Sequence, residues 1–489
     1  MRAYLLGLLI GYPLFTTAQS ATPPCDCPSV LQQVSRKVAD NYAGWTDKVT
    51  AKTKPAHTRL LDSLQQQATK ATTDADCFQL LKAYKAFFRD GHFQVELRNT
   101  GSAATPTPAP VVGVRTIPLS EAQAQQLLLD KAKKHHPVEG IWETPERSYK
   151  LAIIPDPQSA DSLVGVVLAS TNPRWTPGLV KLKLATRNPA AGQVLYRNGA
   201  FEEESLRLAQ TGNLFRIGGY GYWLRRFPQA VTEAEQQTVA RQAIPIEFRQ
   251  LSPQVAYLRV TSFNTPKAQV DSMVRVHQSA LRQTPTLIID IRDNGGGSNS
   301  SFASLLPLMN TNNFQDTHTY MRTSPDNIAA EEAMIARARA GHWDTDSVLN
   351  VWATDVAQAK AHPNQLYRTE GSLLKMDSVL TNPVRVAVLM NANCYSSAEY
   401  FAFYAKQSRK ATLFGQHTGG VMDYGNVRNQ VLDCPHFVLR LPTTRSGWVD
   451  TAPIDNRGFQ PDVVIPATEP DWVDYVVRYY QLPTEQPRR

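Results

Sequence analysis

Three stretches near the start of the chain repeat apolar residues at intervals of three and four. They lie within residues 28–95 and read SVLQQVSRKVADNYAGW, RLLDSLQQQATKA and CFQLLKAYKAFF. This spacing places the apolar side chains on one face of a helix. The pattern therefore predicts an N-terminal helical domain, to which we assign residues 21–99.

The pattern changes to short alternating or β-branched runs between residues 138 and 235, such as YKLAIIP, LVGVVLAS, LVKLKLA and GQVLYR. A period of two is typical of half-buried strands. We therefore expect a compact antiparallel β domain, resembling a small barrel, over residues 138–240. Residues 100–137 connect the two domains, because TGSAATPTPAPVVGV has the composition of a linker and LSEAQAQQLLLDKAKK that of a short helix.

Strand and helix patterns alternate from residue 245 onward. VAYLRV, TLIIDI and VRVAVLM are apolar runs typical of buried strands, and helical patterns separate them. This alternation predicts a layered α/β domain over residues 245–480. Within it, residues 310–380 are polar and rich in charge, which indicates an insertion or a lid.

The first residues, MRAYLLGLLIGYPLFTTAQSA, combine an early Arg, an apolar run and then small residues. This is the layout of a cleaved signal peptide, which we place at residues 1–20. The apolar run is too short to span a bilayer, and no other stretch approaches the length of a membrane helix. We therefore expect a secreted or periplasmic protein without an integral membrane segment.

The composition of the chain argues against nucleic acids and metal ions as partners. The formal charge of the 489 residues is +8, but the cations are dispersed and the densest run, KAKKHH, is short. Such a balance favours solubility over nucleic-acid binding, so we expect no nucleic-acid partner. The chain has no HExxH motif, and its Cys-Asp-Cys segment lacks further ligands at metal-binding spacing, so we expect no metal and no cofactor.

The 5 cysteines suit an oxidising compartment, where some of them would form disulfides. Pairing of Cys25 or Cys27 with Cys77 would tie the start of the helical domain to its own helices. The odd count leaves at least one cysteine that is unpaired or bonded to another molecule. Cys394 would pack as a small buried group.

Two polar segments follow two of the predicted strands. One is the glycine-rich turn of LIIDIRDNGGGSN, and the other is the serine pair of VLMNANCYSSAEYF, at a step from strand to helix. If these strands are neighbours, the amides of Gly297 and Ser397 flank the hydroxyl of Ser396 and form an oxyanion hole beside a nucleophile. The alternative is that Ser396 only caps the helix.

The segments IDIRDNGGG, VLMNANCYSSAEYF, LFGQHTGG and IDNRGFQPDV, in this order between about residues 245 and 470, resemble serine peptidase family 41. The family includes the C-terminal processing (tail-specific) peptidases and the tricorn core protease. The resemblance implies a ClpP/crotonase-like catalytic domain that hydrolyses peptide bonds of proteins or peptides. It also identifies Ser396 as the nucleophile, because the family's serine lies three residues before a Glu, here Glu399. The N-terminal CDCPSVLQQVSRKVADNYAGW resembles exported bacterial members that lack a PDZ domain.

A serine hydroxyl requires a neighbouring base. Tail-specific peptidases use a lysine, but Val421 stands at its position and no lysine follows Lys410. The tricorn branch instead uses a histidine from an N-terminal helical segment and an acid near the C-terminus. The resemblance therefore implies His92, in FFRDGHFQVEL, as the general base and Asp455 as the acid that orients it. His417, in LFGQHTGG, is the alternative base.

The expected function is that of an exported serine endopeptidase with a Ser396–His92–Asp455 triad, acting on a protein or peptide substrate. Because the dyad lysine is absent, the alternative is a catalytically inactive family member that binds peptides or other ligands. The oligomeric state stays open. Four further residues are expected to support the site, namely Gly295, Gly296, Asp290, which forms a buried ion pair with Arg292, and Glu399.

Overall fold

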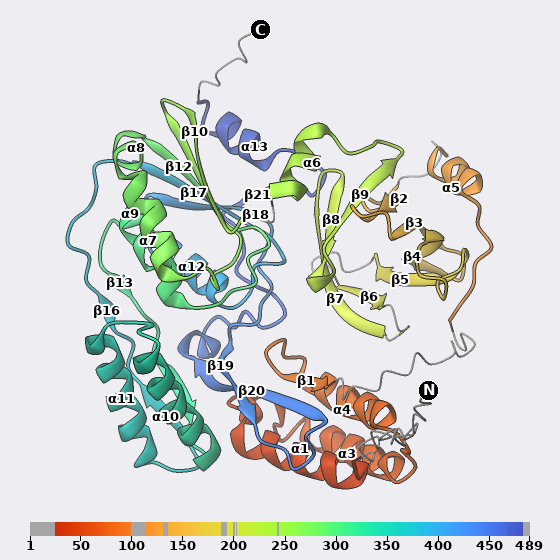
Figure 1. The fold of residues 1–489 in the computed structure, drawn as a ribbon, viewed down its shortest axis with the longest axis horizontal. Helices are drawn as coiled ribbons and strands as arrows, with labels where there is room; N and C mark the ends of the chain where they lie inside the picture. The colour runs from red at the N-terminus through yellow and green to blue at the C-terminus, as the bar shows by residue number, and fades with distance from the viewer. Residues whose placement is uncertain are drawn as a thin grey trace, which may run out of the picture.

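The computed structural model describes residues 25–98, 114–130, 135–186, 193–198, 201, 203–241 and 244–482. The predicted signal peptide (1–20) and most of the predicted linker lie outside the described residues. Figure 1 shows a β-barrel beside a central sheet, with the N-terminal helices below them. In the described part of the chain, no helix has the length and apolar character needed to cross a membrane.

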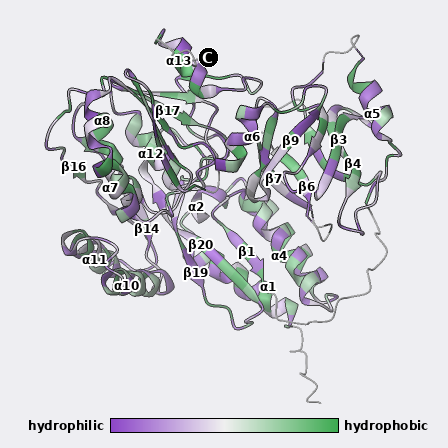
Figure 2. Cartoon of the chain, turned by 45° about the horizontal axis from the view of Figure 1, so that its top comes forward, coloured by the Kyte–Doolittle hydropathy of each residue, from purple (hydrophilic) through white to green (hydrophobic). Residues whose placement is uncertain are grey.

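The N-terminal segment folds into helices because each starts at a capping residue and buries one apolar face. Asp26 accepts a hydrogen bond from the Ser29 amide at the start of the first long helix, and Thr73 and Asp76 form a capping box at the start of the last. Helices on the outside of the molecule alternate between hydrophobic and hydrophilic residues (Figure 2). The elements are α1 (Cys27–Asn41), α2 (Trp45–Lys48), α3 (Lys54–Ala68), α4 (Asp74–Phe88) and the strand β1 (Gln94–Leu97).

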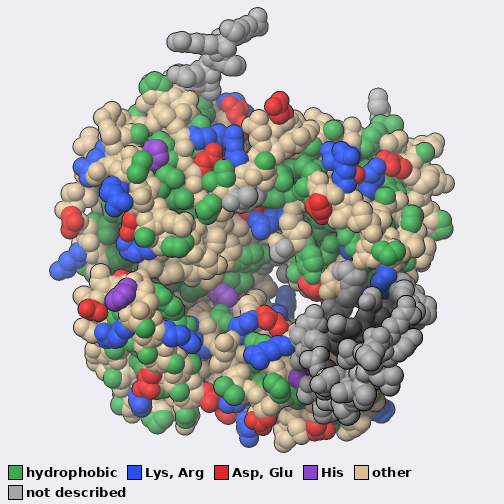
Figure 3. All heavy atoms as spheres, in the orientation of Figure 1, with side chains coloured by type: hydrophobic (Ala, Val, Ile, Leu, Met, Phe, Trp, Pro, Cys, Tyr) green, Lys and Arg blue, Asp and Glu red, His purple; other side chains and the backbone are tan. Residues whose placement is uncertain are grey.

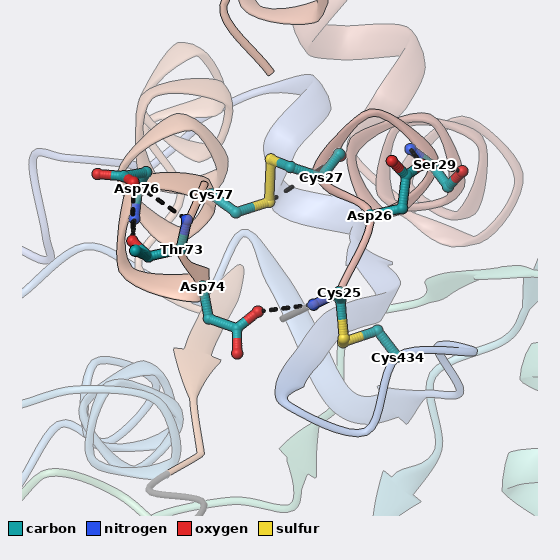
Figure 4. Close-up of a disulfide and its surroundings, with 9 residues drawn as sticks. All are labelled: Cys25, Asp26, Cys27, Ser29, Thr73, Asp74, Asp76, Cys77 and Cys434. Carbon is teal, nitrogen blue, oxygen red and sulfur yellow. Dashed lines mark hydrogen bonds between the residues drawn. A yellow bond between two sulfur atoms is a disulfide. The ribbon is translucent and has the colours of Figure 1, made fainter. Parts of the chain in front are cut away.

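Two disulfides secure this segment (Figure 4). Cys27 and Cys77 join α1 to α4, whereas Cys25 bonds to Cys434, far along the chain. The first bond is one of the two pairings left open by the sequence, and the second was not foreseen. Cys394 is the one free cysteine among the described residues, and it is buried.

The middle segment forms a closed antiparallel barrel of short strands. Its interior is filled by large side chains, including the fully buried Trp142, Trp175 and Trp223. Two short helices, α5 (Glu121–Leu128) and α6 (Glu233–Ala240), flank the barrel in the sequence. The barrel strands are β2 (Gly140–Glu143), β3 (Tyr149–Asp156), β4 (Ser159–Ser170), β5 (Val180–Ala185), β6 (Gln193–Arg197), β7 (Glu203–Thr211), β8 (Leu214–Ile217) and β9 (Tyr222–Phe227).

The central sheet has the strand order β10-β11-β12-β17-β18-β21, and its neighbours are parallel except at the β10–β11 edge. Successive side chains of a strand point to opposite faces. Leu287 and Ile289 therefore face one core with helices α7, α9 and α12, whereas Ile288 faces another core with α13. The elements are β10 (Ile246–Ser252), β11 (Val255–Val260), α7 (Lys267–Val276), α8 (Gln278–Gln283), β12 (Thr286–Asp290), the 3₁₀ helix η4 (Asn299–Leu305), α9 (Leu306–Met309), β17 (Arg385–Met390), α12 (Ser397–Ala405), β18 (Ala411–Gly415), β21 (Val463–Val464) and α13 (Trp472–Tyr479).

A second sheet joins the N-terminal helical segment to the α/β segment of residues 245–480. Its order is β1-β20-β14-β15, with β19 also paired to β20. The region expected as an insertion or lid contributes a helical hairpin and two strands of this sheet, and Lys37 of α1 forms an ion pair with Asp326 of the hairpin at 2.7 Å. The elements are β13 (Phe314–Gln315), β14 (Thr319–Arg322), α10 (Pro325–Ala340), α11 (Asp346–Lys360), β15 (Leu366–Thr369), β16 (Leu373–Leu374), β19 (Tyr424–Gln430) and β20 (Phe437–Ser446).

The predicted α/β fold is thus confirmed, with its N-terminal helices and its barrel-like middle segment. The exact domain boundaries and the lid role of 310–380 stay predictions. Charges of both signs are interspersed over the face of the molecule seen in Figure 3.

Candidate active site

The glycine-rich turn and the serine step lie side by side because β12 and β17 are adjacent parallel strands. Asp290 at the end of β12 is in register with Leu389 of β17. Beyond the strands, the Asp293 amide donates to the Asn391 side chain at 3.0 Å, and the Tyr395 amide donates to the Asn294 carbonyl at 3.0 Å. These bonds hold the two loops as one unit.

Ser396 occupies the start of α12 in an unusual backbone conformation, with φ 56° and ψ −121°. A non-glycine residue in such a region is strained by about 1–3 kcal/mol, and this strain persists only where the surroundings enforce it. The residue is half-buried. Among the described residues its hydroxyl makes no hydrogen bond, so Ser396 does not act as a side-chain cap of α12.

Gly296 must be glycine because of its closeness to the serine. Its φ is +94°, and a Cβ there would lie 2.7 Å from the Ser396 Cβ and 3.0 Å from the Ser397 amide nitrogen. Substitution by any larger residue would therefore displace the serine step. Close approach of two backbones is a typical reason for glycine.

Ser397 is bound to the glycine turn, since its hydroxyl donates to the Gly297 carbonyl at 2.8 Å. The Gly297 and Ser397 amides have no hydrogen-bond acceptor among the residues that the structure describes. Both amides are thus free to donate to a ligand, and Gly295 precedes them in the turn. The two adjacent serines have different surroundings, which favours Ser396 as the reactive one.

Beneath this turn, the fully buried Asp290 forms an ion pair with the partly buried Arg292 at 2.6 Å. Burial raises the pKa of Asp290, but Arg292 outweighs this effect and holds the pKa at about 2. The barrel also reaches the turn, because the Tyr222 hydroxyl donates to the Asp293 carboxylate and Arg216 lies 3.7 Å from it. The barrel therefore braces the segment that carries Gly297.

His92 follows α4 in a tight turn. Its amide donates to the Asp90 carboxylate at 2.8 Å, and Asp90 also accepts a hydrogen bond from the Tyr42 hydroxyl at 2.8 Å. The His92 Nδ1 lies 2.5 Å from the Tyr424 carbonyl oxygen. A carbonyl oxygen only accepts hydrogen bonds, so Nδ1 carries the proton and Nε2 is left as the basic nitrogen.

The turn of His92 packs close to the serine step through Val421, the residue at the position of the family lysine. A Cβ on Gly91 would lie 2.7 Å from the Val421 Cγ1, so the two segments touch. The Val421 amide in turn donates to Glu399, in the same helix as Ser396, at 2.9 Å. Among the described residues, however, no hydrogen bond joins His92 to Ser396.

Glu399 holds the loop that leads to Tyr424. Its carboxylate accepts hydrogen bonds from the Thr418 hydroxyl at 2.6 Å, the Gly420 amide at 2.6 Å and the Met422 amide at 3.1 Å. It is fully buried, and this burial raises its pKa. Glu399 thus links the helix of Ser396 to the backbone that orients His92.

Asp455 forms an ion pair with Lys48 of α2, and its amide donates to Asp423 at 2.9 Å. Burial raises the pKa of Asp455 to about 6, although Lys48 acts to lower it. In the described structure Asp455 has no contact with His92, whose Nδ1 is held by Tyr424 instead. The orienting contact expected from Asp455 is therefore made by a backbone carbonyl. Lys48 binds one oxygen of the Asp455 carboxylate, and the other, Oδ1, is buried without a hydrogen-bond partner in the described chain.

Sequence reasoning did not foresee the roles of Tyr424 and Lys48. The Tyr424 contact is made by a backbone atom, which carries no residue-type signal, and Lys48 is 407 residues from its partner. His417, the alternative base, lies in the loop after β18, where its Nδ1 is 2.7 Å from the Thr418 carbonyl.

Residues 254–465 match the family model described as Peptidase family S41. The chain carries an S41 peptidase domain. This match confirms the resemblance drawn from the sequence and makes the protein a serine-type peptidase. A search of curated proteins finds no match.

Several solved structures are similar to this chain. Mature CPAF complexed with lactacystin has 14% sequence identity and a TM-score of 0.52, and the match covers 93% of this chain and 98% of that one. The likeness of fold therefore extends beyond the S41 domain to the helices and the barrel. The tricorn protease has 13% sequence identity and a TM-score of 0.41, and the match covers 93% of this chain and 36% of that one. The photosystem II D1 C-terminal processing protease has 13% identity and a TM-score of 0.37, and the match covers 91% of this chain and 94% of that one.

Proposed function

We propose that this S41 protein is an exported serine endopeptidase in which Ser396 is the nucleophile and His92 the general base. The observation that carries the proposal is the strained Ser396, whose hydroxyl has no partner among the described residues, together with the free amides of Gly297 and Ser397. A residue kept in a costly conformation at the end of a strand is typical of a serine nucleophile.

The chemistry follows from this arrangement. His92 Nε2 takes the Ser396 proton as the oxygen attacks the peptide carbonyl, and the imidazolium then donates this proton to the leaving amine. The Gly297 and Ser397 amides donate to the oxyanion of the tetrahedral intermediate, and loss of one such donor costs about 2.7–4 kcal/mol. The Tyr424 carbonyl keeps Nδ1 protonated throughout.

The third member of the triad can be supplied in two ways. In the proposal from the sequence, Asp455 orients His92, which requires Asp455 to turn away from Lys48. In the proposal from the geometry, the Tyr424 carbonyl alone does so. Asp455→Asn decides between them, since removal of an orienting carboxylate can lower kcat by about 10⁴-fold, whereas loss of a Lys48 partner affects stability more than kcat.

Export is supported by the predicted signal peptide and by the Cys25–Cys434 and Cys27–Cys77 disulfides. Disulfides persist in oxidising compartments such as a periplasm or the cell exterior. The alternative of an inactive, peptide-binding family member is favoured by one observation, the absence of a hydrogen bond between His92 and Ser396 in the described structure. Catalytic hydrogen bonds often tighten only when substrate binds, so this observation does not outweigh the others.

The test is intact-mass analysis after treatment with a small fluorophosphonate. We expect the wild type to gain one label, Ser396→Ala to gain none, and His92→Ala to label far more slowly. Ser397→Ala is the matched control, because it keeps the backbone amide and should still be labelled. Labelling that persists in Ser396→Ala, or a wild type that is never labelled, would contradict the proposal.

A further inference from the structure

A cavity lined by arginines lies among residues of α6, β10, β11 and α13. Its volume is about 340 Å³. Figure 1 shows α6 between the barrel and the central sheet. Four arginines and two aspartates line it, so the lining residues carry a net charge of +2. The arginines are Arg241, Arg249, Arg259 and Arg292.

The cavity and Ser396 lie on opposite faces of the central sheet, although Arg292 both lines the cavity and pairs with Asp290 beneath the glycine turn. Arg259 alternates along β11 with Leu258 and Val260, which face the core of α12, and it therefore shares the opposite face with Tyr257 and α13. Ser396, at the start of α12, is on the other side of the sheet.

Arg259 is buried, and although the charge of the nearby Asp290 outweighs this burial and raises its pKa, its guanidinium has no hydrogen-bond acceptor in the described chain. Its exposed fraction is 3%, and within the described residues it makes no ion pair. Burial of an unpaired charge is costly, so native proteins pair such groups or bind a counter-ion. The cavity beside Arg259 provides the space for one.

The acids nearest to Arg259 are already engaged. Asp290 lies opposite it in register, but one carboxylate oxygen accepts from Arg292 Nε at 2.9 Å and the other from the Tyr257 hydroxyl at 2.8 Å. Of the two aspartates in the lining, Asp471 caps α13 and Asp474 accepts from Arg478 at 2.7 Å. The described chain thus leaves the Arg259 guanidinium unsatisfied.

A second donor and an apolar wall complete the site. The indole nitrogen of Trp472 is buried and has no hydrogen-bond partner in the described chain. Apolar side chains of Leu251, Val473 and Val477 line the same cavity. A guanidinium is suited to bidentate binding of a carboxylate or phosphate, and the wall suits an apolar group attached to it.

We propose that this cavity binds a small organic oxyanion with an apolar part, and that Arg259 is its principal contact. Carboxylates fit best, because Arg259 offers one planar guanidinium and Trp472 an uncharged indole. The other three arginines of the lining are already paired, Arg241 and Arg249 with Glu247 and Arg292 with Asp290. Peptide hydrolysis at Ser396 does not require this ligand, so the cavity would be a second binding site of the S41 protein.

Isothermal titration calorimetry on the full-length protein tests the proposal with three probes: N-acetyl-leucine, its uncharged amide, and phenyl phosphate. We expect N-acetyl-leucine to bind, the amide not to bind, and Arg259→Gln to weaken binding at least about tenfold, the loss of one charge-assisted pair. Binding of phenyl phosphate alone would keep the oxyanion site but assign it to phosphates. Failure of both anions at millimolar concentration, or equal binding by the variant, would overturn the proposal.

A stability measurement guards against a variant that simply misfolds. Without ligand, Arg259→Met should unfold close to the wild-type temperature, because the loss of its attraction to Asp290 is offset by the removal of a buried charge. N-acetyl-leucine should raise the melting temperature of the wild type only. If Arg259→Met instead melts well below the wild type, Arg259 is a structural residue and the proposal fails. Fluorophosphonate labelling of Ser396 should be unchanged in this variant, so this test is independent of the proposed peptidase function.

Discussion

Adjacent residues of the same type have different roles in this site, and the conformation of the backbone determines the role of each residue. Ser397 donates its hydroxyl to Gly297 and so holds the glycine turn, whereas Ser396 is turned out of the helix by its positive φ. Two carboxylates in different parts of the site also differ in their charge state. Asp290 stays ionised beside Arg292, while Asp455 is held in a site that favours its protonated form.

The largely buried Asp455 should make the stability of the protein depend on pH. Burial raises its pKa from the usual 3.8 to about 6, so between these values the native state binds a proton more tightly than the unfolded chain does. Stability contributed by this group is therefore greatest at low pH and is lost as the pH rises through about 6. Relative to Asp455→Asn, the wild type should lose about 2 kcal/mol of stability between pH 4 and pH 7.

Chemical denaturation of both proteins across this pH range measures the difference. Asp62→Asn is a suitable control. Asp62 is an exposed residue of α3, so its replacement should not change how stability depends on pH. If the free energies of unfolding of the wild type and Asp455→Asn change in parallel with pH, burial does not raise the pKa of the Asp455 carboxyl.

At the scale of elements, the turn after α4 must bring His92 against the loop that follows β18. The fit is tight, because a Cβ on Gly91 would lie 2.7 Å from the Val421 Cγ1. We predict that Gly91→Ala shifts His92 and lowers kcat about ten- to hundredfold, as small displacements of catalytic groups do. The double variant Gly91→Ala/Val421→Ala should recover most of this loss.

Steady-state kinetics on a peptide substrate, together with the melting temperature, compare the two variants. Val421→Ala alone serves as the reference for the double variant. If the double variant is no more active than Gly91→Ala, the effect does not arise from contact with Val421.

The elements that the sequence predicted well are those with local signals. The three long N-terminal helices, the barrel strands and the alternating strands of the central sheet all have regular apolar spacing. The juxtaposition of the glycine turn and Ser396 was also predictable, because carboxyl ends of neighbouring parallel strands meet at one edge. The pairing of β1 with β20 was not, since the partners Gln94 and Arg440 share no local pattern.

The same distinction applies to the candidate site. Residue types and the family resemblance pointed to Ser396 and His92, but a carbonyl contact such as that of Tyr424 depends on the path of the backbone alone. The Lys48–Asp455 pair depends on two segments that meet only in the folded molecule.

At the scale of the whole molecule, the barrel is coupled to the catalytic segment through Asp293. Tyr222 and Arg216 of the barrel both contact this buried carboxylate. We predict that Tyr222→Phe lowers kcat about tenfold, because a lost hydrogen bond to a charged buried group costs about 1.5–3 kcal/mol and loosens the turn that carries Gly297.

Tyr220→Phe is the matched control, because the exposed Tyr220 hydroxyl donates to Glu204 on the barrel surface at 2.8 Å. Its kcat should equal that of the wild type. Unchanged kcat in Tyr222→Phe would mean that the barrel does not influence the oxyanion turn.

The Cys25–Cys434 disulfide changes the topology of the chain as well as its packing. It joins positions 409 residues apart, so the peptide between them, with both His92 and Ser396, is a covalent ring. One hydrolysed peptide bond anywhere in this ring opens it without releasing a fragment. If one copy of the protease cleaved another at a single bond in this ring, the two pieces would therefore stay covalently joined. The segment with His92 would separate from the segment with Ser396 only after reduction of the disulfide.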